Sequence, residues 1–264
     1  MFKKKITIIF ISILLYQTPL LSKSNSLNEF NSKNLSRYFS GIVAFENKDN
    51  SKALNFFNSS KILINRHEPY LERLVISSVL EGKVKQAINF IKINDKKNNS
   101  EFLEAYILLT LDSLKKNNIN KAIEILSEIP EKLQKERLNF IIVNSLIQYV
   151  DVFKNKKIEK RKKNFGNLSY ISETFQRCYL GDKNTDSFFL KLINNIQADY
   201  SRYIFFYLTY LIEENRIEDA KAITNDLDHI STTLLLSQGK SWIERDENKE
   251  FSKVFSCDNH NDIV

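Results

Sequence analysis

The stretch KNNINKAIEILSEIP, residues 116–130, decides the fold because its pattern recurs along the chain. It contains a polar turn, then an alanine followed by an apolar pair, and it ends in a proline. The same arrangement of turn, alanine and apolar pair occurs in GKVKQAINFI (82–91) and in KDNSKALNFF (48–57). The recurrence predicts that one structural unit is repeated.

The spacing of the alanines gives the length of that unit. Ala53 and Ala87 are 34 residues apart, and Ala87 and Ala122 are 35 residues apart. A later copy, ENRIEDAKAI (214–223), places Ala220 98 residues after Ala122, which is close to three more periods. A fixed period of about 34 residues is typical of stacked helical hairpins.

Composition favours helices over strands. Only 5 Gly and 3 Pro occur in 264 residues, whereas β-hairpin proteins need many turn residues. In YLERLVISSVL (70–80) the apolar residues spread over a face too broad for one partner helix to cover. Such a helix needs a neighbour on each side, and a solenoid of stacked hairpins supplies both neighbours.

These repeats resemble the tetratricopeptide-repeat (TPR) family. The family pattern of small, alanine and large apolar positions is matched by Gly41, Ala53 and Phe57 in the first unit, by Leu71, Leu74, Ala87 and Ile91 in the second, by Tyr106, Leu109, Ala122 and Leu126 in the third, and loosely by Leu208, Ala220 and Leu227 later. The chain departs from the pattern at Val75, Ser78 and Ser113, and at Pro130, which comes two places early. The resemblance implies an all-α fold, a right-handed α-solenoid of about six to seven hairpins.

The expected organisation has five parts. They are a signal peptide (1–24), a flexible leader (25–33), regular repeats (34–130), degenerate helical repeats with a basic linker (131–199, linker 154–163), and C-terminal repeats without a capping helix (200–264). Segment 138–153 is expected to be a buried helix, and further helices are expected at 165–180, 185–196, 200–212 and 232–245. How these helices pair into hairpins stays open. Because the last period ends part-way through a unit, we expect that the natural chain continues or that another subunit covers its apolar end.

The N-terminus predicts export. Lys3, Lys4 and Lys5 precede the apolar run ITIIFISILLY (6–16), and small residues follow near Ser22 and Ser24. This order is typical of a secretory signal peptide, and the run is short for a membrane span. We therefore expect a periplasmic protein, or a membrane-associated one if the signal stays as an uncleaved anchor.

The net charge of +7 comes from two short segments. Three lysines lie in the N-terminal segment, and KNKKIEKRKK (154–163) holds seven basic residues and one acid, so the remainder is close to neutral. A nucleic-acid partner is therefore not expected. The run is interpreted as a solvated linker or as a docking site for an acidic partner or anionic surface, through Lys156, Lys157, Lys160, Arg161, Lys162 and Lys163.

No motif for catalysis, a metal or a cofactor is found. His67, His229 and His260 have no partner at metal-ligand spacing, and no P-loop, nucleophile elbow or dinucleotide fingerprint occurs. We expect a protein that is not an enzyme, with no cofactor and no metal. Cys178 and Cys257 are separated by more than two repeat lengths, so we expect two thiols and no disulfide.

Two functions are expected from the family resemblance. The first is an exported scaffold that holds a protein or peptide partner in the cell envelope, in a groove lined by the first helix of each hairpin. Carried over by position, the groove candidates are Phe45, Ile76, Val79, Leu111 and Leu114. Because all five are apolar, burial between repeats is an equal alternative for them.

The second is a helical platform of a cell-envelope enzyme or a polysaccharide or peptidoglycan system. Tyr203, Phe206, Tyr207 and Tyr210 form one face of a helix, and Tyr207 and Tyr210 are the candidates for contact with a peptide or glycan chain. The alternative interpretation of that face is packing between hairpins, which is the commoner role of an aromatic stripe.

Overall fold

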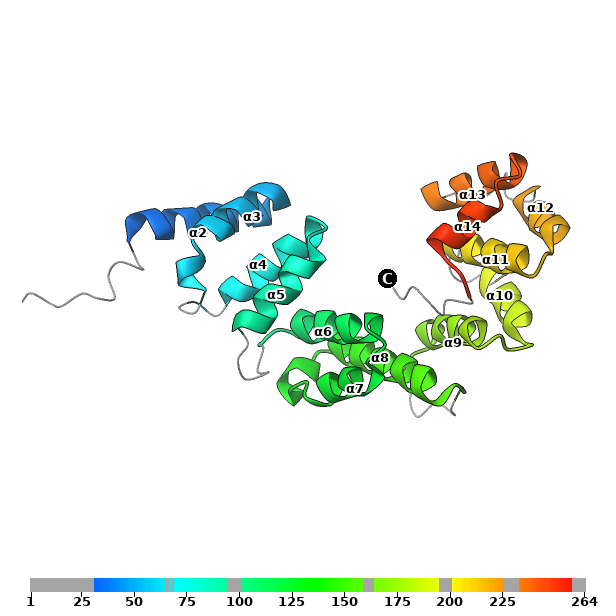
Figure 1. The fold of residues 1–264 in the computed structure, drawn as a ribbon, viewed down its shortest axis with the longest axis horizontal. Coiled ribbons are helices and arrows are strands. Elements are labelled where there is room, and N and C mark those ends of the chain that lie inside the picture. The colour runs from blue at the N-terminus through cyan, green and yellow to red at the C-terminus, as the bar shows by residue number, and fades with distance from the viewer. Residues whose placement is uncertain are drawn as a thin grey trace, which may run out of the picture. The chain divides into compact units, whose positions relative to one another are not determined.

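The computed structural model describes residues 31–64, 67, 69–94, 101–158, 164–194, 201–225 and 233–257. Within these residues every regular element is a helix and no strand occurs (Figure 1). The all-α class predicted from the sequence is therefore confirmed. The proposed signal peptide and most of the leader lie outside the described residues, and α2 begins at Ser32.

The chain forms two compact units. Unit 1 comprises residues 1–101 and unit 2 residues 102–264. The described helices of unit 1 are α2 (Ser32–Glu46), α3 (Asn50–Ser59), the short 3-10 helix η1 (Lys61–Leu63), α4 (Pro69–Leu80) and α5 (Val84–Asn94). The four α-helices pack on one another in chain order, and α2 also contacts α4.

Unit 2 is also built from helices that pack in chain order. Its described helices are α6 (Leu103–Lys115), α7 (Ile119–Ser127), η2 (Glu131–Gln134), α8 (Arg137–Asn155), α9 (Asn167–Tyr179), α10 (Thr185–Ile193), α11 (Ser201–Glu213), α12 (Ile217–Asn225), α13 (Leu234–Glu244) and α14 (Lys249–Val254). Neighbouring helices pack in chain order, and α11 also contacts α13 and α14.

One turn geometry joins the two helices of every hairpin in the described chain. Each turn contains one residue in the left-handed conformation, with φ between 56° and 70°. These residues are Lys48, Gly82, Asn117, Gly181, Asn215 and Asp246. The following residue donates its N–H to a carbonyl five positions earlier, as in Asp49 to Ala44 (2.9 Å) and Lys83 to Ser78 (2.8 Å). This is the Schellman ending of a helix, repeated six times.

Equivalent positions around these turns are buried alike. The residue seven places before the left-handed residue is buried in all six hairpins: Gly41, Val75, Thr110, Thr174, Leu208 and Gly239. The residue five places after it is Ala53, Ala87, Ala122 or Ala220 in four hairpins, and each of these alanines is fully buried. In these four hairpins the alanines that set the spacing in the sequence therefore lie at one buried position of the second helix.

The middle of the chain departs from the hairpin pattern. The apolar segment 138–153, predicted as one buried helix, lies in α8, which has 19 residues and packs against both α7 and α9. Only Val143, Val150 and Val152 of this segment are buried, so the predicted burial was wrong for most of it. The segments after it pair as α9 with α10, α11 with α12 and α13 with α14. The structure thus settles the pairing that the sequence left open.

The cysteine prediction was wrong, because Cys178 on α9 and Cys257 form a disulfide with their Cα atoms 5.0 Å apart. The prediction assumed that hairpins contact only their neighbours. Instead, the chain after α14 turns back past α11, and Phe255 packs against Phe175 of α9 with ring centroids 5.7 Å apart. Phe251 of α14 is buried, whereas Leu234 and Val254 are 88% and 51% exposed.

Candidate functional site

A close contact between α2 and α3 shapes the first hairpin. Gly41 faces the ring of Phe57, and a Cβ atom at position 41 would lie 2.7 Å from Phe57 Cε1. Phe57 is fully buried, and its ring packs against Tyr38 and Tyr70. Glycine at 41 therefore lets the two helices approach closely on the side where the core lies.

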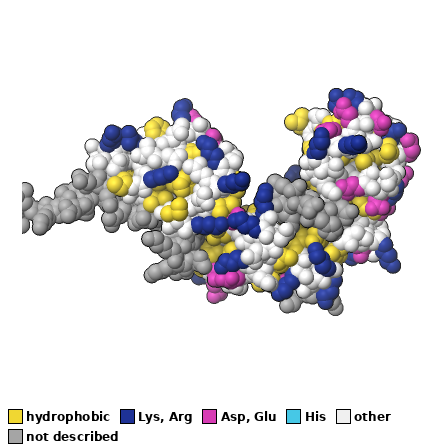
Figure 2. All heavy atoms as spheres, viewed as in Figure 1, with side chains coloured by type: hydrophobic (Ala, Val, Ile, Leu, Met, Phe, Trp, Pro, Cys, Tyr) yellow, Lys and Arg dark blue, Asp and Glu magenta, His cyan; other side chains and the backbone are white. Residues whose placement is uncertain are grey.

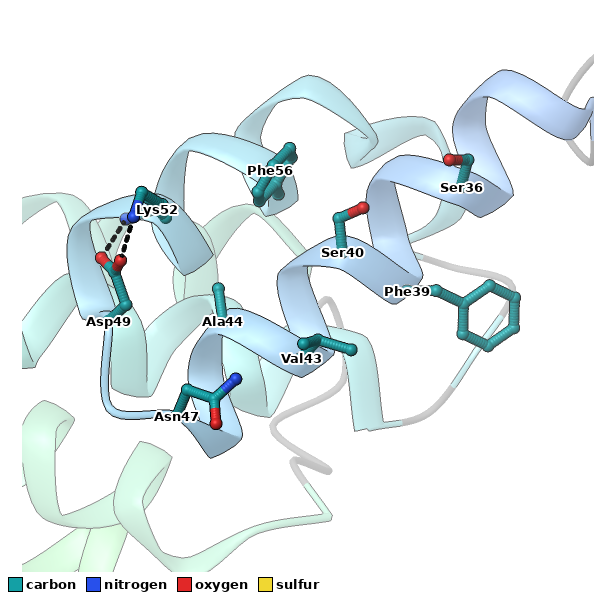
Figure 3. A pocket seen from close by; sticks show the side chains of 9 residues that line it. All are labelled: Ser36, Phe39, Ser40, Val43, Ala44, Asn47, Asp49, Lys52 and Phe56. Atoms are coloured by element: carbon teal, nitrogen blue, oxygen red, sulfur yellow. Dashed lines mark hydrogen bonds and ion pairs between the residues drawn. The ribbon is translucent and has the colours of Figure 1, made fainter.

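The same hairpin also carries an open groove of about 540 Å³ (Figure 3). Four apolar and five polar residues line it: Ser36, Phe39, Ser40, Val43, Ala44, Asn47, Asp49, Lys52 and Phe56. We call it the α2–α3 groove. Phe39 and Val43 are each 59% exposed and lie one helical turn apart on α2.

The polar end of the α2–α3 groove is fixed by the cap of α3. Asp49 is the N-cap residue, and its carboxylate accepts the backbone N–H of Lys52 at 3.2 Å. The Lys52 ammonium lies 2.7 Å from the same carboxylate and lowers the pKa of Asp49. This end of the groove therefore presents an ion pair without a net charge.

Phe39 and Val43 were not among the groove residues predicted from the sequence. Those residues were taken from the positions that line the groove in the TPR family, which on α2 gave Phe45. The signal that could have found them is local: Phe39 and Val43 form an apolar pair four residues apart on α2, on a different side from the buried Tyr38, Gly41 and Ala44. On the face drawn in Figure 2, hydrophobic side chains of unit 1 reach the surface beside Lys and Arg side chains.

The five groove residues predicted by position have different exposures. In unit 1, Phe45, Ile76 and Val79 are half-buried, and Phe45 packs against the core that contains Tyr38 and Phe57. In unit 2, Leu111 is 44% exposed, whereas Leu114 is only 4% exposed and belongs to the core of its hairpin. Leu114 is therefore not available to a partner in the folded unit, which corrects that part of the prediction.

The tyrosine candidates behave as packing residues. Tyr207 is 2% exposed and donates its hydroxyl hydrogen to Asp186 Oδ1 at 2.9 Å, and Arg216 donates to the same oxygen at 2.6 Å. Burial and then the hydrogen bond to the Asp186 carboxylate raise the pKa of Tyr207. Tyr210 is half-buried and stacks on Phe189 at 5.8 Å. Tyr207 therefore cannot face a glycan or a peptide while unit 2 is folded.

Only the beginning of the basic run lies in the described chain. Lys156 ends α8 in the left-handed conformation, and its ammonium contacts the hydroxyl of Tyr179 and lies 4.6 Å from the ring centroid. Lys157 is exposed. Lys160, Arg161, Lys162 and Lys163 lie outside the described residues.

The described residues hold neither a candidate metal site nor a candidate membrane span. No group of three or more His, Cys, Asp or Glu side chains there is placed to hold a metal ion. None of the helices there is both long and apolar enough to cross a membrane.

The comparisons with known proteins give one weak similarity. No protein-family model matches the chain, and no solved structure matches it. Protein Ycf2 of Marchantia polymorpha is 28% identical to it over 211 residues, which is 76% of this chain but 9% of that protein. The chain therefore resembles a small part of a much longer protein.

Proposed function

We propose that this protein is an exported, non-enzymatic scaffold of TPR-like hairpins, stacked as a right-handed α-solenoid, which binds a segment of a partner protein in the cell envelope. The observation that carries the proposal is the recurrence of one hairpin, with the same Schellman turn, six times in the described chain. Repeated hairpins create extended surfaces that suit the binding of other chains.

The α2–α3 groove supports the choice of a protein partner. Phe39 and Val43 form an exposed apolar pair on α2, and Phe56 of α3 and five polar residues also line the groove. An amphipathic helix recognises such a groove by placing apolar side chains at i and i+4 into it. The ion pair of Asp49 and Lys52 at one end would favour a partner segment that is polar, but not strongly charged, at that point.

The cysteines support the proposed compartment. Disulfides form and persist in oxidising spaces such as the periplasm and are rare in the cytosol. The Cys178–Cys257 disulfide therefore agrees with export, which the basic and apolar N-terminus predicts independently. N-terminal sequencing of the protein from envelope fractions should find a start near Lys23 or Asn25, and an intact Met1 in the cytoplasm would contradict export.

Partner capture tests the proposal. The tagged full-length chain should retain a specific partner from envelope extracts, and Phe39→Ser with Val43→Ser should lose it. The matched control is Leu80→Ser with Ile93→Ser, which removes two apolar residues of unit 1 that are 57% and 66% exposed and lie outside the α2–α3 groove. A photo-reactive amino acid at position 39 should crosslink the same partner.

Two results would count against the proposal. Equal loss of the partner in the control variant would show that capture depends on general surface hydrophobicity. Full retention by the Phe39→Ser, Val43→Ser variant would remove the α2–α3 groove from the binding surface. Circular dichroism of both variants, compared with the wild type, checks that the helices are intact.

A further inference from the structure

Unit 2 carries an aromatic surface that its own chain covers. Phe175 of α9 and Tyr203 and Phe206 of α11 form a cluster, with the Phe175 centroid 6.0 Å from Tyr203 and 5.2 Å from Phe206. These three side chains are only partly buried even with the chain end lying on them. We call them the aromatic surface.

The covering segment is Phe255–Cys257, which we call the latch. Phe255 is extended, with φ −153° and ψ 147°, and its ring stands edge-on to Phe206 at 5.0 Å and to Phe175 at 5.7 Å. Figure 1 shows the red end of the described chain leaving α14 and running toward α9. The latch therefore lies across α9 and α11, the first helices of two consecutive hairpins, as a bound extended peptide would.

Two further anchors hold the latch beside the aromatic ring. The backbone N–H of Cys257 donates to Glu213 Oε2 of α11 at 3.1 Å. The Cys257 sulfur is bonded to Cys178 of α9. Within three residues, the latch thus uses one aromatic side chain, one charge-assisted backbone hydrogen bond and one covalent bond.

We propose that the aromatic surface is a binding site for an extended peptide segment with an aromatic residue, and that the latch occupies the site in cis until the disulfide is reduced. This inference rests on the proposed scaffold function and names a second binding surface, separate from the α2–α3 groove. Two of the three anchors are ones that a peptide from another chain can reproduce. An aromatic ring gains from edge-to-face contacts, and a backbone N–H two residues later can reach Glu213.

The disulfide determines whether the latch or a peptide from another chain occupies the aromatic surface. A tethered segment already has an effective concentration in the millimolar range, and a disulfide removes its dissociation altogether. A dithiol reductant opens the latch by thiol–disulfide exchange. Two electrons and two protons pass from the dithiol to the two sulfurs, Cys178 and Cys257 become thiols, and the reductant becomes a cyclic disulfide.

The test measures fluorescence anisotropy of a labelled peptide, Ser-Lys-Val-Phe-Ser-Ser, which copies residues 252–257 with serine in place of the cysteine. It is titrated with the full-length oxidised chain, with the chain in dithiothreitol, and with the variant Phe255→Ala, Cys257→Ser. The variant has neither the aromatic anchor nor the covalent bond of the latch. A peptide with alanine at its phenylalanine position is the matched control.

We expect the variant to bind the peptide at least tenfold more tightly than the oxidised chain does, with the reduced wild type in between. The alanine peptide should not bind. Adding Glu213→Ala to the variant should weaken binding by removing one acceptor on the helix surface, and this change does not disturb a buried side chain.

If the oxidised chain and the variant bind the peptide equally, the latch does not block the aromatic surface. If a variant with native helicity does not bind the peptide, the aromatic surface is not a peptide-binding site. Neither result bears on capture through Phe39 and Val43, so the failure of this inference and the failure of the proposed function are distinguishable.

Discussion

Gly41→Ala is the substitution with the clearest expected effect on unit 1. A Cβ atom at position 41 would lie 2.7 Å from Phe57 Cε1 and 2.8 Å from Cδ1, closer than two carbon atoms can stand. The Phe57 ring cannot swing away easily, because it is fully buried between Tyr38 and Tyr70, with centroids 6.0 and 5.7 Å away. The helices α2 and α3 must therefore move apart.

Two opposing contributions set the magnitude of that effect. Overpacking of this kind costs about 1–3 kcal/mol. Alanine is favoured over glycine inside a helix by about 1 kcal/mol, which offsets part of the cost. We therefore expect Gly41→Ala to lower the free energy of unfolding by about 1 kcal/mol.

Urea unfolding of the full-length chain, followed by circular dichroism, measures this change. The double variant Gly41→Ala, Phe57→Leu is the control, because the smaller side chain removes the ring that the new methyl group meets. Its destabilisation should be less than the sum of the two single changes. If Gly41→Ala instead stabilises the chain by about 1 kcal/mol, α2 and α3 do not cross closely at this point and the packing described for the first hairpin is wrong.

Three other measurements test separate features of the structure. Lys48→Gly should raise the stability of unit 1 by up to about 1 kcal/mol in the same assay, since Lys48 holds a φ of 63° that glycine adopts without strain; a loss of stability would contradict the turn. Burial raises the pKa of Tyr70 to about 12, so the folded state holds its proton more tightly than the unfolded state does. This difference in proton binding contributes at most about 3 kcal/mol to the free energy of unfolding, and the contribution is intact below pH 10 and falls as the pH rises from 10 to 12. If a Tyr70→Phe variant shows the same pH dependence of ellipticity as the wild type in this range, the raised pKa is wrong. Reduction of the Cys178–Cys257 disulfide, or Cys178→Ser with Cys257→Ser, should lower the stability of unit 2 by about 2–5 kcal/mol in calorimetry, because the bond closes a loop with a sequence separation of 79 residues; identical transitions with and without dithiothreitol would show that the bond is absent.

The sequence predicted the helices closely because their signals are local. Segments 165–180, 185–196, 200–212 and 232–245 correspond to α9, α10, α11 and α13 with small shifts at the ends. The alanine spacing located the hairpin crossings for the same reason, since a helix pair can approach closely only where a small residue such as Ala53 or Ala122 lies.

The contacts that depend on how the chain returns on itself could not be predicted. Nothing in the sequence around Cys257 indicates that Phe255 reaches α9 after α14 ends. The burial of Leu114 and Tyr207 depends on which neighbouring helix covers each face, and repeat positions alone do not give that. Phe39 and Val43 were not predicted because the TPR family pattern assigns the groove to other positions of the first helix, such as Phe45.

The central claim is that one helical hairpin, with one turn, is repeated along the chain. Backbone chemical shifts from triple-resonance NMR on the full-length chain test it most directly, because they report φ at each turn residue. We expect a positive φ at Lys48, Gly82, Asn117, Gly181, Asn215 and Asp246, with helical shifts on both sides of each. Helical φ values at Lys48, Asn117 or Asn215 would mean that the two helices run on as one, and would contradict the account.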